Sequence, residues 1–496
     1  MVKAPDGQVF YLLGLIVFLI YGLDRKIIMK MAYHNLKANK LKSTKKFHKI
    51  STFLFLPIFL VSLISINAHA KKLSDYTPYN YDVLFTNPDC KEHTYKDPIN
   101  SVKGELIYNK PKNAYCKPEE NKKVEEQKHT PFYRIKEWIR DPETKEIFMA
   151  YLSFSKKAIR DELCTAIKER GLKLTLIVDK NNKKRGMESL LDLKSCPAFR
   201  IGQDGISIPE VLTRGGEGRG KNKIGFAHNK LILINPHQKG KVKLAFSSGN
   251  MSNGTTTHHE NWHFITTNSE SYFFQSHLCL KKGLLDHASS IDVFTIFIKE
   301  CRATIEAPEE TDIKAFFVPA EGKEAMEALK SEMGHASEIR MATHRFSSKE
   351  IIASMEEALE RGAHIQFVFD DDLYWTSKLK RGMGRNLYRE AVHVDNLIQK
   401  GLKVKYIETF ADSVFGARKV QLQHNKFLIF TGPMHDSYSV FTGAGNLTGA
   451  AFQKNFENFY LIKDPAVYFM FRLQYYRFWN DMGTAAEDMP ERLVLP

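Results

Sequence analysis

A histidine and a lysine stand two residues apart in the stretch "AHNKLILINP", just before a short apolar run. The run, residues 231–234, is rich in β-branched side chains and is followed by Asn-Pro, which predicts a buried strand. Because side chains at i and i+2 of a strand project from the same face, His228 and Lys230 point the same way. Both groups are costly to bury without partners. A core strand that begins with an imidazole and an ammonium therefore requires an explanation beyond packing.

The same arrangement occurs again in "QHNKFLIFTG", where His424 and Lys426 precede a second apolar run. Farther along, "SSGN" and "GAGN" place Asn250 and Asn446 after small residues at the end of the next predicted strand, where backbone can approach a ligand closely. Each copy thus offers an imidazole, an ammonium and a carboxamide. Such groups can act as nucleophile, acid or base and can stabilise phosphoryl oxygens without a metal ion. A single histidine of this kind is more often structural, but repetition of the whole set favours a function.

The elements that must position these residues are also repeated. Residues 146–179 predict a strand, an amphipathic helix ending at Gly171 and a second strand ending at Asp179. Residues 338–372 repeat this order, and residues 385–408 add a further helix and strand. Strands that alternate with helices predict an α/β fold, with a sandwich around a central mixed sheet in each half.

This duplicated pattern resembles the signature of the phospholipase D superfamily, which is His-x-Lys, four residues, Asp, and then Gly-Ser-x-Asn. The resemblance covers the chain from about Glu146 to its end. It implies that the two α/β halves pack as a pseudo-two-fold pair around one active site. It also implies that one histidine attacks phosphorus to form a phosphohistidine, while the other protonates the leaving alcohol and then activates water or an acceptor alcohol. No metal ion or other cofactor is expected.

The resemblance assigns six catalytic residues, three in each half-site: His228, Lys230 and Asn250, and His424, Lys426 and Asn446. Ser248 matches the motif serine, and Ser252 and Thr448 match the hydroxyl that often follows the asparagine. Glu260 and Glu457 each precede an asparagine and match acidic residues that hydrogen-bond the catalytic histidines and fix their tautomer.

Two features depart from the family pattern. The motif aspartate is Asn235 in the first copy and Thr431 in the second, and the serine of the second copy is Ala444. Tyrosyl-DNA phosphodiesterases, which belong to the superfamily, work without that aspartate, so activity is still expected. The missing serine suggests unequal halves and favours His228 as the nucleophile and His424 as the general acid, with the reverse assignment left open.

Two other polar stretches carry weaker signals. "GGEGRGK", residues 215–221, fits the start of a phosphate-binding loop, but Asn222 replaces the Ser or Thr and a strand follows instead of a helix. It is interpreted as a loop beside the site. The adjacent His258 and His259 point to opposite faces of a strand, which makes them a poor metal site.

The N-terminal region has the features of a targeting sequence. Residues 52–67 are apolar and uncharged, follow a lysine-rich stretch and precede Ala-His-Ala. This pattern predicts a signal peptide cleaved near Ala70 and export to the periplasm or the outside of the cell. A second apolar stretch, residues 9–23, leaves two alternatives: an internal start at Met29 or Met31, or a membrane-anchored leader.

The chain is predicted to comprise a leader (1–70), an irregular cysteine-containing lead-in (71–140), a first half (141–308) and a second half (309–496). All six cysteines follow the predicted cleavage point, and an even set in an exported chain suggests disulfides. Pairing of sequence neighbours predicts the disulfides Cys90–Cys116, Cys164–Cys196 and Cys279–Cys301.

The net charge limits what can be said about the substrate. Residues 1–70 hold ten Lys/Arg and two Asp/Glu, so they supply +8 of the formal +15 and leave +7 for the rest. Much of the basic charge thus belongs to targeting, which weakens a nucleic-acid interpretation. A phospholipid at a membrane surface is the favoured phosphodiester, acted on by a monomer with an internal pseudo-dimer. A secreted nuclease, a cardiolipin-synthase-like transferase and a non-catalytic phosphate-binding protein remain alternatives.

Overall fold

The computed structural model describes residues 80–86, 99–100, 106–107, 128–181, 196, 200–201, 207–216, 220–380, 385–409 and 422–491. The predicted leader and the predicted Cys90–Cys116 pair lie outside these ranges. Among the helices within them, none is both long and apolar enough to cross a membrane.

The first sheet gathers strands from the N-terminal part of the described chain. Its order is β1 (Asn80–Thr86), β11 (His258–Asn268), β10 (Lys241–Ser247), β9 (Lys230–Ile234), β4 (Glu146–Tyr151), β5 (Lys173–Asp179) and β8 (Glu210–Arg214). Strand β4 pairs in parallel with β5 and antiparallel with β9, so the sheet is mixed. The short strand β16 (Leu422–Gln423), from much later in the chain, also pairs with β11.

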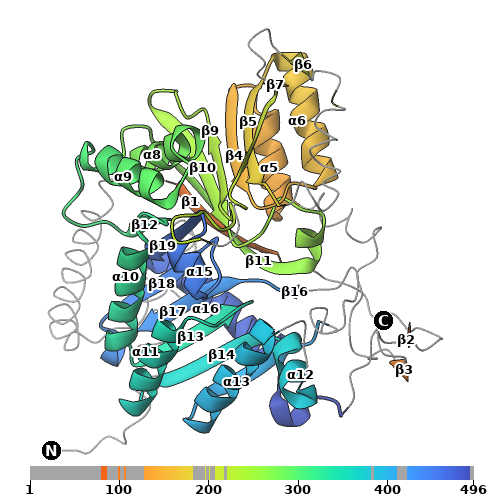
Figure 1. Cartoon of the computed structure of the whole chain (residues 1–496), viewed down its shortest axis with the longest axis vertical. Coiled ribbons are helices and arrows are strands. Elements are labelled where there is room, and N and C mark those ends of the chain that lie inside the picture. Colours follow the sequence, from red (N-terminus) through yellow and green to blue (C-terminus); the bar gives the residue numbers. More distant parts are fainter. Residues whose placement is uncertain are drawn as a thin grey trace, which may run out of the picture. The chain divides into compact units, whose positions relative to one another are not determined.

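The second sheet repeats this arrangement strand for strand. Its order is β12 (Ile313–Val318), β19 (Glu457–Ile462), β18 (Tyr438–Gly443), β17 (Lys426–Thr431), β13 (Glu338–Thr343), β14 (His364–Asp370), β15 (Lys403–Ile407) and β20 (Gly483–Ala485). The predicted fold class, α/β with two repeated sandwich halves around mixed sheets, is confirmed (Figure 1). Two further pairs of short strands are β2 (Ile99–Asn100) with β3 (Leu106–Ile107), and β6 (Arg200–Ile201) with β7 (Ser207–Ile208).

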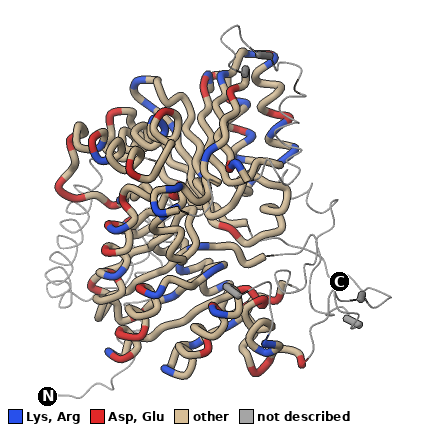
Figure 2. Tube along the Cα trace, viewed as in Figure 1, with Lys and Arg blue, Asp and Glu red and all other residues tan. Residues whose placement is uncertain are grey.

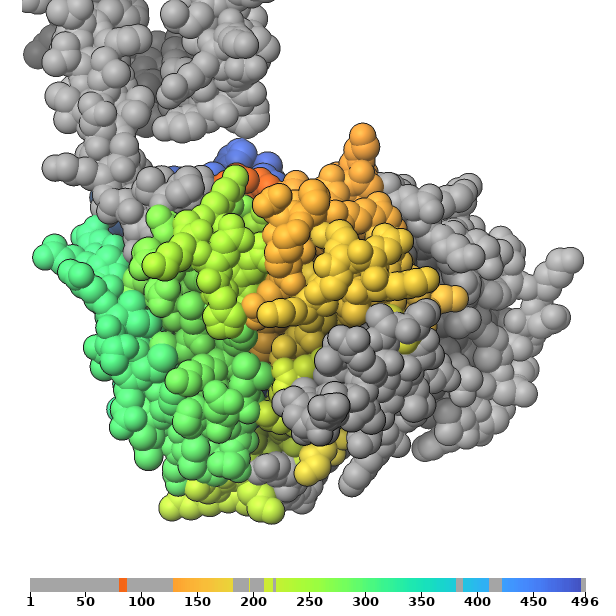
Figure 3. All heavy atoms as spheres, turned by 90° about the horizontal axis from the view of Figure 1, so that it is seen from above, coloured from red at the N-terminus to blue at the C-terminus, as the bar shows by residue number. Residues whose placement is uncertain are grey.

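Helices cover the outer faces of both sheets and fill the space between them. The outer helices are α5 (Pro131–Arg140) and α6 (Lys157–Arg170) on the first sheet, and α10 (Gly322–His335), α11 (Lys349–Glu360), α12 (Asp371–Leu379) and α13 (Arg385–Gln399) on the second. The inner helices, which pack in a core common to both sheets, are α8 (Tyr272–Asp286), α9 (Ile291–Ala303) and α16 (Pro465–Tyr476). In Figure 3, α5 and α6 (orange to yellow) and α8 and α9 (green) lie on opposite sides of the first half.

Alternation along the central strands separates the cores. In β9, Leu231 and Leu233 face the common core, whereas Ile232 and Ile234 face α5 and α6. Both faces of this strand are buried, which is why its sequence is an unbroken apolar run. Burial on both faces holds the strand in the sheet and fixes the direction in which His228, just before it, can project.

The lead-in is more regular than predicted. Strand β1 lies at the edge of the first sheet in antiparallel register with β11, and Val83 is buried. Helix α5 begins with Thr130, whose hydroxyl accepts a hydrogen bond from the backbone N–H of Tyr133, followed by a proline at the first turn. These capping signals were present in the sequence, so the prediction of an irregular segment is wrong for both stretches.

Two of the three predicted disulfides are present. Cys164 of α6 is bonded to Cys196, and Cys279 of α8 is bonded to Cys301 of α9. The second bond joins two neighbouring helices of the common core, and α8 also packs against β12 of the second sheet.

Candidate active site

The two His-x-Lys pairs stand at the starts of equivalent strands. Lys230 is the first residue of β9 and Lys426 the first of β17, and each lysine Nζ donates to the backbone carbonyl of the histidine two residues earlier, at 2.9 Å in the first half and 2.7 Å in the second. Nζ also lies 3.2 Å from Nε2 of the same histidine in both halves. His228 and His424 are each 8% exposed, which leaves the imidazoles reachable only from the site itself.

Backbone pairing between the halves brings the two motifs together. His259 of β11 pairs in parallel with Gln423, and in the mirrored position Phe456 pairs in parallel with Ala227. These pairings hold the residues that follow, His424 and His228, against the backbone of the other half. The backbone N–H of His424 donates to the carbonyl of His259 at 3.1 Å, and that of His228 donates to the carbonyl of Phe456 at 2.9 Å.

This register places each predicted glutamate on the histidine of the other half. Glu457 Oε2 lies 2.8 Å from His228 Nδ1, and Glu260 Oε1 lies 2.7 Å from His424 Nδ1. Both glutamates are completely buried. A carboxylate accepts the Nδ1 proton and leaves Nε2 with its lone pair, the tautomer that nucleophilic or base catalysis needs. Burial opposes ionisation of Glu260, but its interactions with His424, the hydrogen bonds from His258 and His424 and the charge of Lys426 outweigh it and hold the pKa of Glu260 below its usual range.

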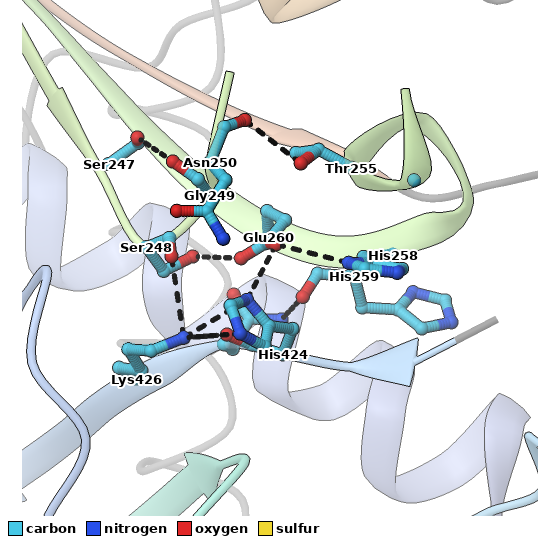
Figure 4. Close-up of polar contacts among 12 residues, drawn as sticks. Ser247, Ser248, Gly249, Asn250, Thr255, His258, His259, Glu260, His424 and Lys426 are labelled. Atoms are coloured by element: carbon cyan, nitrogen blue, oxygen red, sulfur yellow. Dashed lines mark hydrogen bonds and ion pairs between the residues drawn. The ribbon is translucent and has the colours of Figure 1, made fainter. Parts of the chain in front are cut away.

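The second oxygen of each glutamate is held differently in the two halves. Ser248 Oγ donates to Glu260 Oε2 at 2.7 Å, so the motif serine acts on the pair that contains His424 (Figure 4). In the other half-site Asn455 Nδ2 donates to Glu457 Oε1 at 3.0 Å. Asn455 thus supplies the hydrogen bond that Ala444 cannot.

The two asparagines predicted to be catalytic, Asn250 and Asn446, have buried side-chain oxygens without a hydrogen-bond partner. Asn446 and Thr448 line a cavity of about 290 Å³ together with His228 and Glu457, so residues of both halves meet around one space. Ser252 is not among the residues that line this cavity; its hydroxyl lies 2.9 Å from that of Thr255.

Burial shifts the titration of the charged groups. It lowers the pKa of Lys230 to about 8 and that of Lys426 to about 7, against the opposing attraction of Glu457 and Glu260. It also lowers the pKa of His228, and lowers that of His424 to about 3. Both imidazoles are therefore neutral at neutral pH in the free protein, which suits a nucleophile.

Four asparagines connect the two halves, and two of them, Asn229 and Asn425, were expected from strand alternation to point away from the site. Asn229 Nδ2 donates to Asn458 Oδ1 at 3.3 Å, and Asn261 Nδ2 donates to Asn425 Oδ1 at 3.1 Å. The middle residue of each His-x-Lys thus meets the asparagine that follows the opposite glutamate. The repeated "HN" and "EN" pairs were the available signal, but a single strand gives no indication of its partner in the other half.

Two buried aspartates support the backbone that precedes each catalytic histidine. Asp179 Oδ2 accepts from the N–H of Ala227, and Asp370 Oδ2 accepts from the N–H of Gln423, both at 2.7 Å. Each aspartate ends an equivalent strand, β5 or β14, and is fully buried. The sequence shows both strands ending in aspartate, but not that these carboxylates position the histidine segments.

The family's motif aspartate is replaced by Asn235 and Thr431. These residues lie at the ends of β9 and β17 that are opposite to the histidines. Asn235 follows β9 and accepts the backbone N–H groups of Lys145 and Glu146, at 2.8 and 3.0 Å. Thr431 ends β17, where its hydroxyl lies 2.8 Å from that of Tyr468. Both residues are structural, and neither contacts the catalytic groups.

The weaker loop signal has no catalytic contact among the described residues. Arg214, at the end of β8, donates to the backbone carbonyls of Leu284 and Leu285, each at 2.7 Å. Arg219 lies outside the described residues.

Residues 329–479, which contain His424, Lys426, Asn446 and Glu457, match the family described as "Cardiolipin synthase, PLD-like domain". This part of the chain therefore carries a PLD-like domain of that family. No curated protein matches it significantly in sequence.

Solved structures share the phospholipase D fold. The phosphatidylserine synthase of Haemophilus influenzae Rd KW20 is 15% identical, with 72% of this chain and 86% of that chain covered and a TM-score of 0.50. Nuc of Salmonella typhimurium, a phospholipase D family member, is 22% identical, with 35% and 96% covered and a TM-score of 0.26. Yeast tyrosyl-DNA phosphodiesterase is 10% identical, with 66% and 86% covered and a TM-score of 0.41. At 15% identity the likeness to the synthase shows the fold alone.

If each glutamate orients the opposite histidine, Glu457→Gln should lower kcat by about 10–100-fold, because an amide cannot balance the charge that develops on His228. The free energy of unfolding should change little, since the amide keeps the same volume and one acceptor. The control is Glu327→Gln on the exposed face of α10. A Glu457→Gln enzyme as fast as the wild type would show that this phospholipase D site does not depend on the pair.

The buried lysines predict an alkaline limit to activity. Below about pH 7 both are ammonium ions that can hold an anionic diester, and kcat/KM should fall as pH rises through their pKa values of about 7 and 8. The measurement is kcat/KM against pH on a soluble diester. A fall only near 10.5, the ordinary lysine value, would contradict this account.

Proposed function

We propose that this chain is a phosphodiesterase of the phospholipase D type that acts through a phosphohistidine, with phospholipids as its substrates. The observation that carries the proposal is the crossed pair of buried His–Glu contacts, each beside a lysine. Two imidazoles fixed in the same tautomer, with two lysines and two free carboxamides, match the needs of a two-step displacement at phosphorus.

In the first step Nε2 of His228 attacks phosphorus, and the bond from phosphorus to the leaving alcohol breaks. His424 gives that alcohol oxygen a proton, which its imidazole gains when the anionic diester binds and raises the pKa of the ring. Lys230, Lys426 and the two asparagine amides hold the non-bridging oxygens. In the second step His424 takes a proton from water or an acceptor alcohol, whose oxygen attacks phosphorus and releases Nε2 of His228.

Several observations support a phospholipid as the diester. The matched family is described by cardiolipin synthase, and the synthase from Haemophilus influenzae is named for phosphatidylserine. The cavity beside His228 combines polar groups with the apolar side chains of Leu152, Phe226, Ala450 and Ala451. Acidic and basic residues are mixed along α10, α11 and α13, whereas nucleic-acid binding favours a basic stripe (Figure 2).

A nucleic-acid phosphodiesterase is the second candidate, because the chain beyond residue 70 still carries a net charge of +7. Transfer of phosphatidyl groups, as in cardiolipin synthesis, would use the same first step with a different acceptor. We further propose that the protein is exported by cleavage near Ala70 and works as a monomer. Mass spectrometry of the exported protein tests the cleavage site, and its molecular mass in native solution tests whether it is a monomer.

Incubation with phosphatidylcholine or phosphatidylglycerol vesicles and a primary alcohol should yield the phosphatidyl alcohol. His228→Ala and His424→Ala should lower the rate by about a thousandfold or more, since each removes a reacting group. His129→Gln, at an exposed position far from both motifs in sequence, is the matched control. Denaturation of His424→Ala at alkaline pH, where the phosphorus–nitrogen bond of a phosphohistidine is stable, should trap phosphate on His228.

The same preparation is tested on DNA in EDTA. DNA cleavage without lipid turnover would replace the lipid substrate with nucleic acid. Equal inertness of the wild type and both variants on every diester would reject catalysis altogether. Phosphate trapped on His424 would reverse the two histidine roles.

A further inference from the structure

Around His424 lies a second cluster of donors that the reaction above does not use in full. His258, Glu260 and His424 each offer one ligand atom, and the three atoms lie within 4.8 Å of one another. Glu260 Oε1 lies 2.7 Å from His424 Nδ1 and 3.6 Å from His258 Nδ1. Figure 4 shows Glu260 between the two rings, with His258 from the same strand and His424 from the other half. Glu260 and the ring of His424 are buried, whereas the side chain of His258 is 22% exposed and gives access from solvent.

A third imidazole stands beside this cluster. The ring of His344 lies 4.8 Å from that of His424, centroid to centroid, and that of His258 lies 5.6 Å from it. Both ring nitrogens of His344 are buried and have no hydrogen-bond partner. Unpaired buried ring nitrogens are costly, and here they lie beside three convergent donors.

The equivalent place in the other half lacks this set. The residue two positions before the glutamate is His258 in the first half and Asn455 in the second, so it faces the same carboxylate in each. Asn455 donates to Glu457 and cannot act as an imidazole ligand. The cluster is therefore specific to the half-site of His424.

We propose that His258, Glu260 and His424 form a binding site for a divalent ion of the zinc class, and that the ion inhibits the enzyme. Two imidazoles and one carboxylate are a ligand set that zinc accepts, with water completing a tetrahedral site. This regulatory role rests on the proposed phosphodiesterase function, whereas the binding site itself does not. The ion is not a cofactor of the reaction.

Inhibition follows from the tautomer of His424. In the free site Nδ1 carries the proton that Glu260 accepts, and Nε2 keeps its lone pair. An ion on Nδ1 needs the lone pair of that nitrogen, so the single ring proton moves from Nδ1 to Nε2. A metal-bound imidazole with a proton on Nε2 can neither attack phosphorus nor accept a proton from water. The ion also takes Glu260 from its orienting role.

The positive charge of Lys426 affects how tightly the proposed site binds an ion. Lys426 Nζ lies 3.0 Å from His424 Nδ1, and its positive charge opposes a cation, so binding should be reversible and weaker than at a structural zinc site. Thiolates do not compete, because the four cysteines in the described part of the chain, Cys164, Cys196, Cys279 and Cys301, are in disulfides.

Binding is measured first, without any substrate. The full chain is titrated with Zn²⁺ by calorimetry and with Co²⁺ by visible absorption, where a four-coordinate site gives an intense band. We expect one ion per chain, with the affinity reduced at least tenfold in His258→Asn, which copies the residue of the other half. Glu260→Gln is the second variant, in case the first disturbs folding, and His129→Gln is the matched control. Absence of saturable binding, or binding unchanged in both site variants, would overturn the site.

Inhibition is measured next, as the ratio of rates with and without Zn²⁺ within each protein. The wild type and His129→Gln should lose activity as the site fills and regain it with EDTA, whereas His258→Asn should need at least tenfold more Zn²⁺. Saturated binding without loss of activity would refute the inhibitory role and leave the site. A protein inactive on every diester but still binding one ion would refute the proposed function and leave the site standing.

Discussion

Each catalytic histidine is held by a glutamate that belongs to the other half of the molecule. The contacts are short and fully buried, and they are set by parallel backbone pairing just before each histidine. A half on its own would have an imidazole with no partner for Nδ1 and a buried carboxylate with no cation. Because each histidine depends on a glutamate of the other half, the site forms only when the two halves pack together. This dependence explains why both copies keep their polar residues as well as their core pattern.

The same constraint governs the electrostatics. Two lysines and two glutamates are buried within a few ångströms of the histidines, and every charge depends on a neighbour for its stability. Burial brings both lysine pKa values close to neutrality, so the site holds its positive charge only weakly when empty. In the proposed function a phosphodiester supplies the missing anion. Binding of the substrate then stabilises the ammonium ions and gives an imidazole its proton, which couples recognition to catalytic readiness.

The sequence predicted the features that follow from the geometry of a single strand, but not those that depend on contacts between distant segments. The i and i+2 rule placed His228 beside Lys230, and the repeat revealed the second set, because both follow from one strand's geometry. The support from Asp179 and Asp370, and the Asn229–Asn458 pair, depend on contacts between segments far apart in sequence. The departure at Asn235 is harmless for a reason that only the fold shows: it lies at the opposite end of β9 from the site.

The two differences between the half-sites are linked by the hydrogen-bonding capacity of a carboxylate. Glu457 has no serine, since Ala444 occupies that position, and its second oxygen is satisfied by Asn455. Glu260 already has Ser248 on its second oxygen, so the position equivalent to Asn455 need not supply a hydrogen bond. That position is free to carry His258, an imidazole beside the carboxylate that orients His424. Ser248 in one half and Asn455 in the other are thus alternative ways of completing the equivalent carboxylate, and only the first leaves the position two residues before the glutamate free for an imidazole.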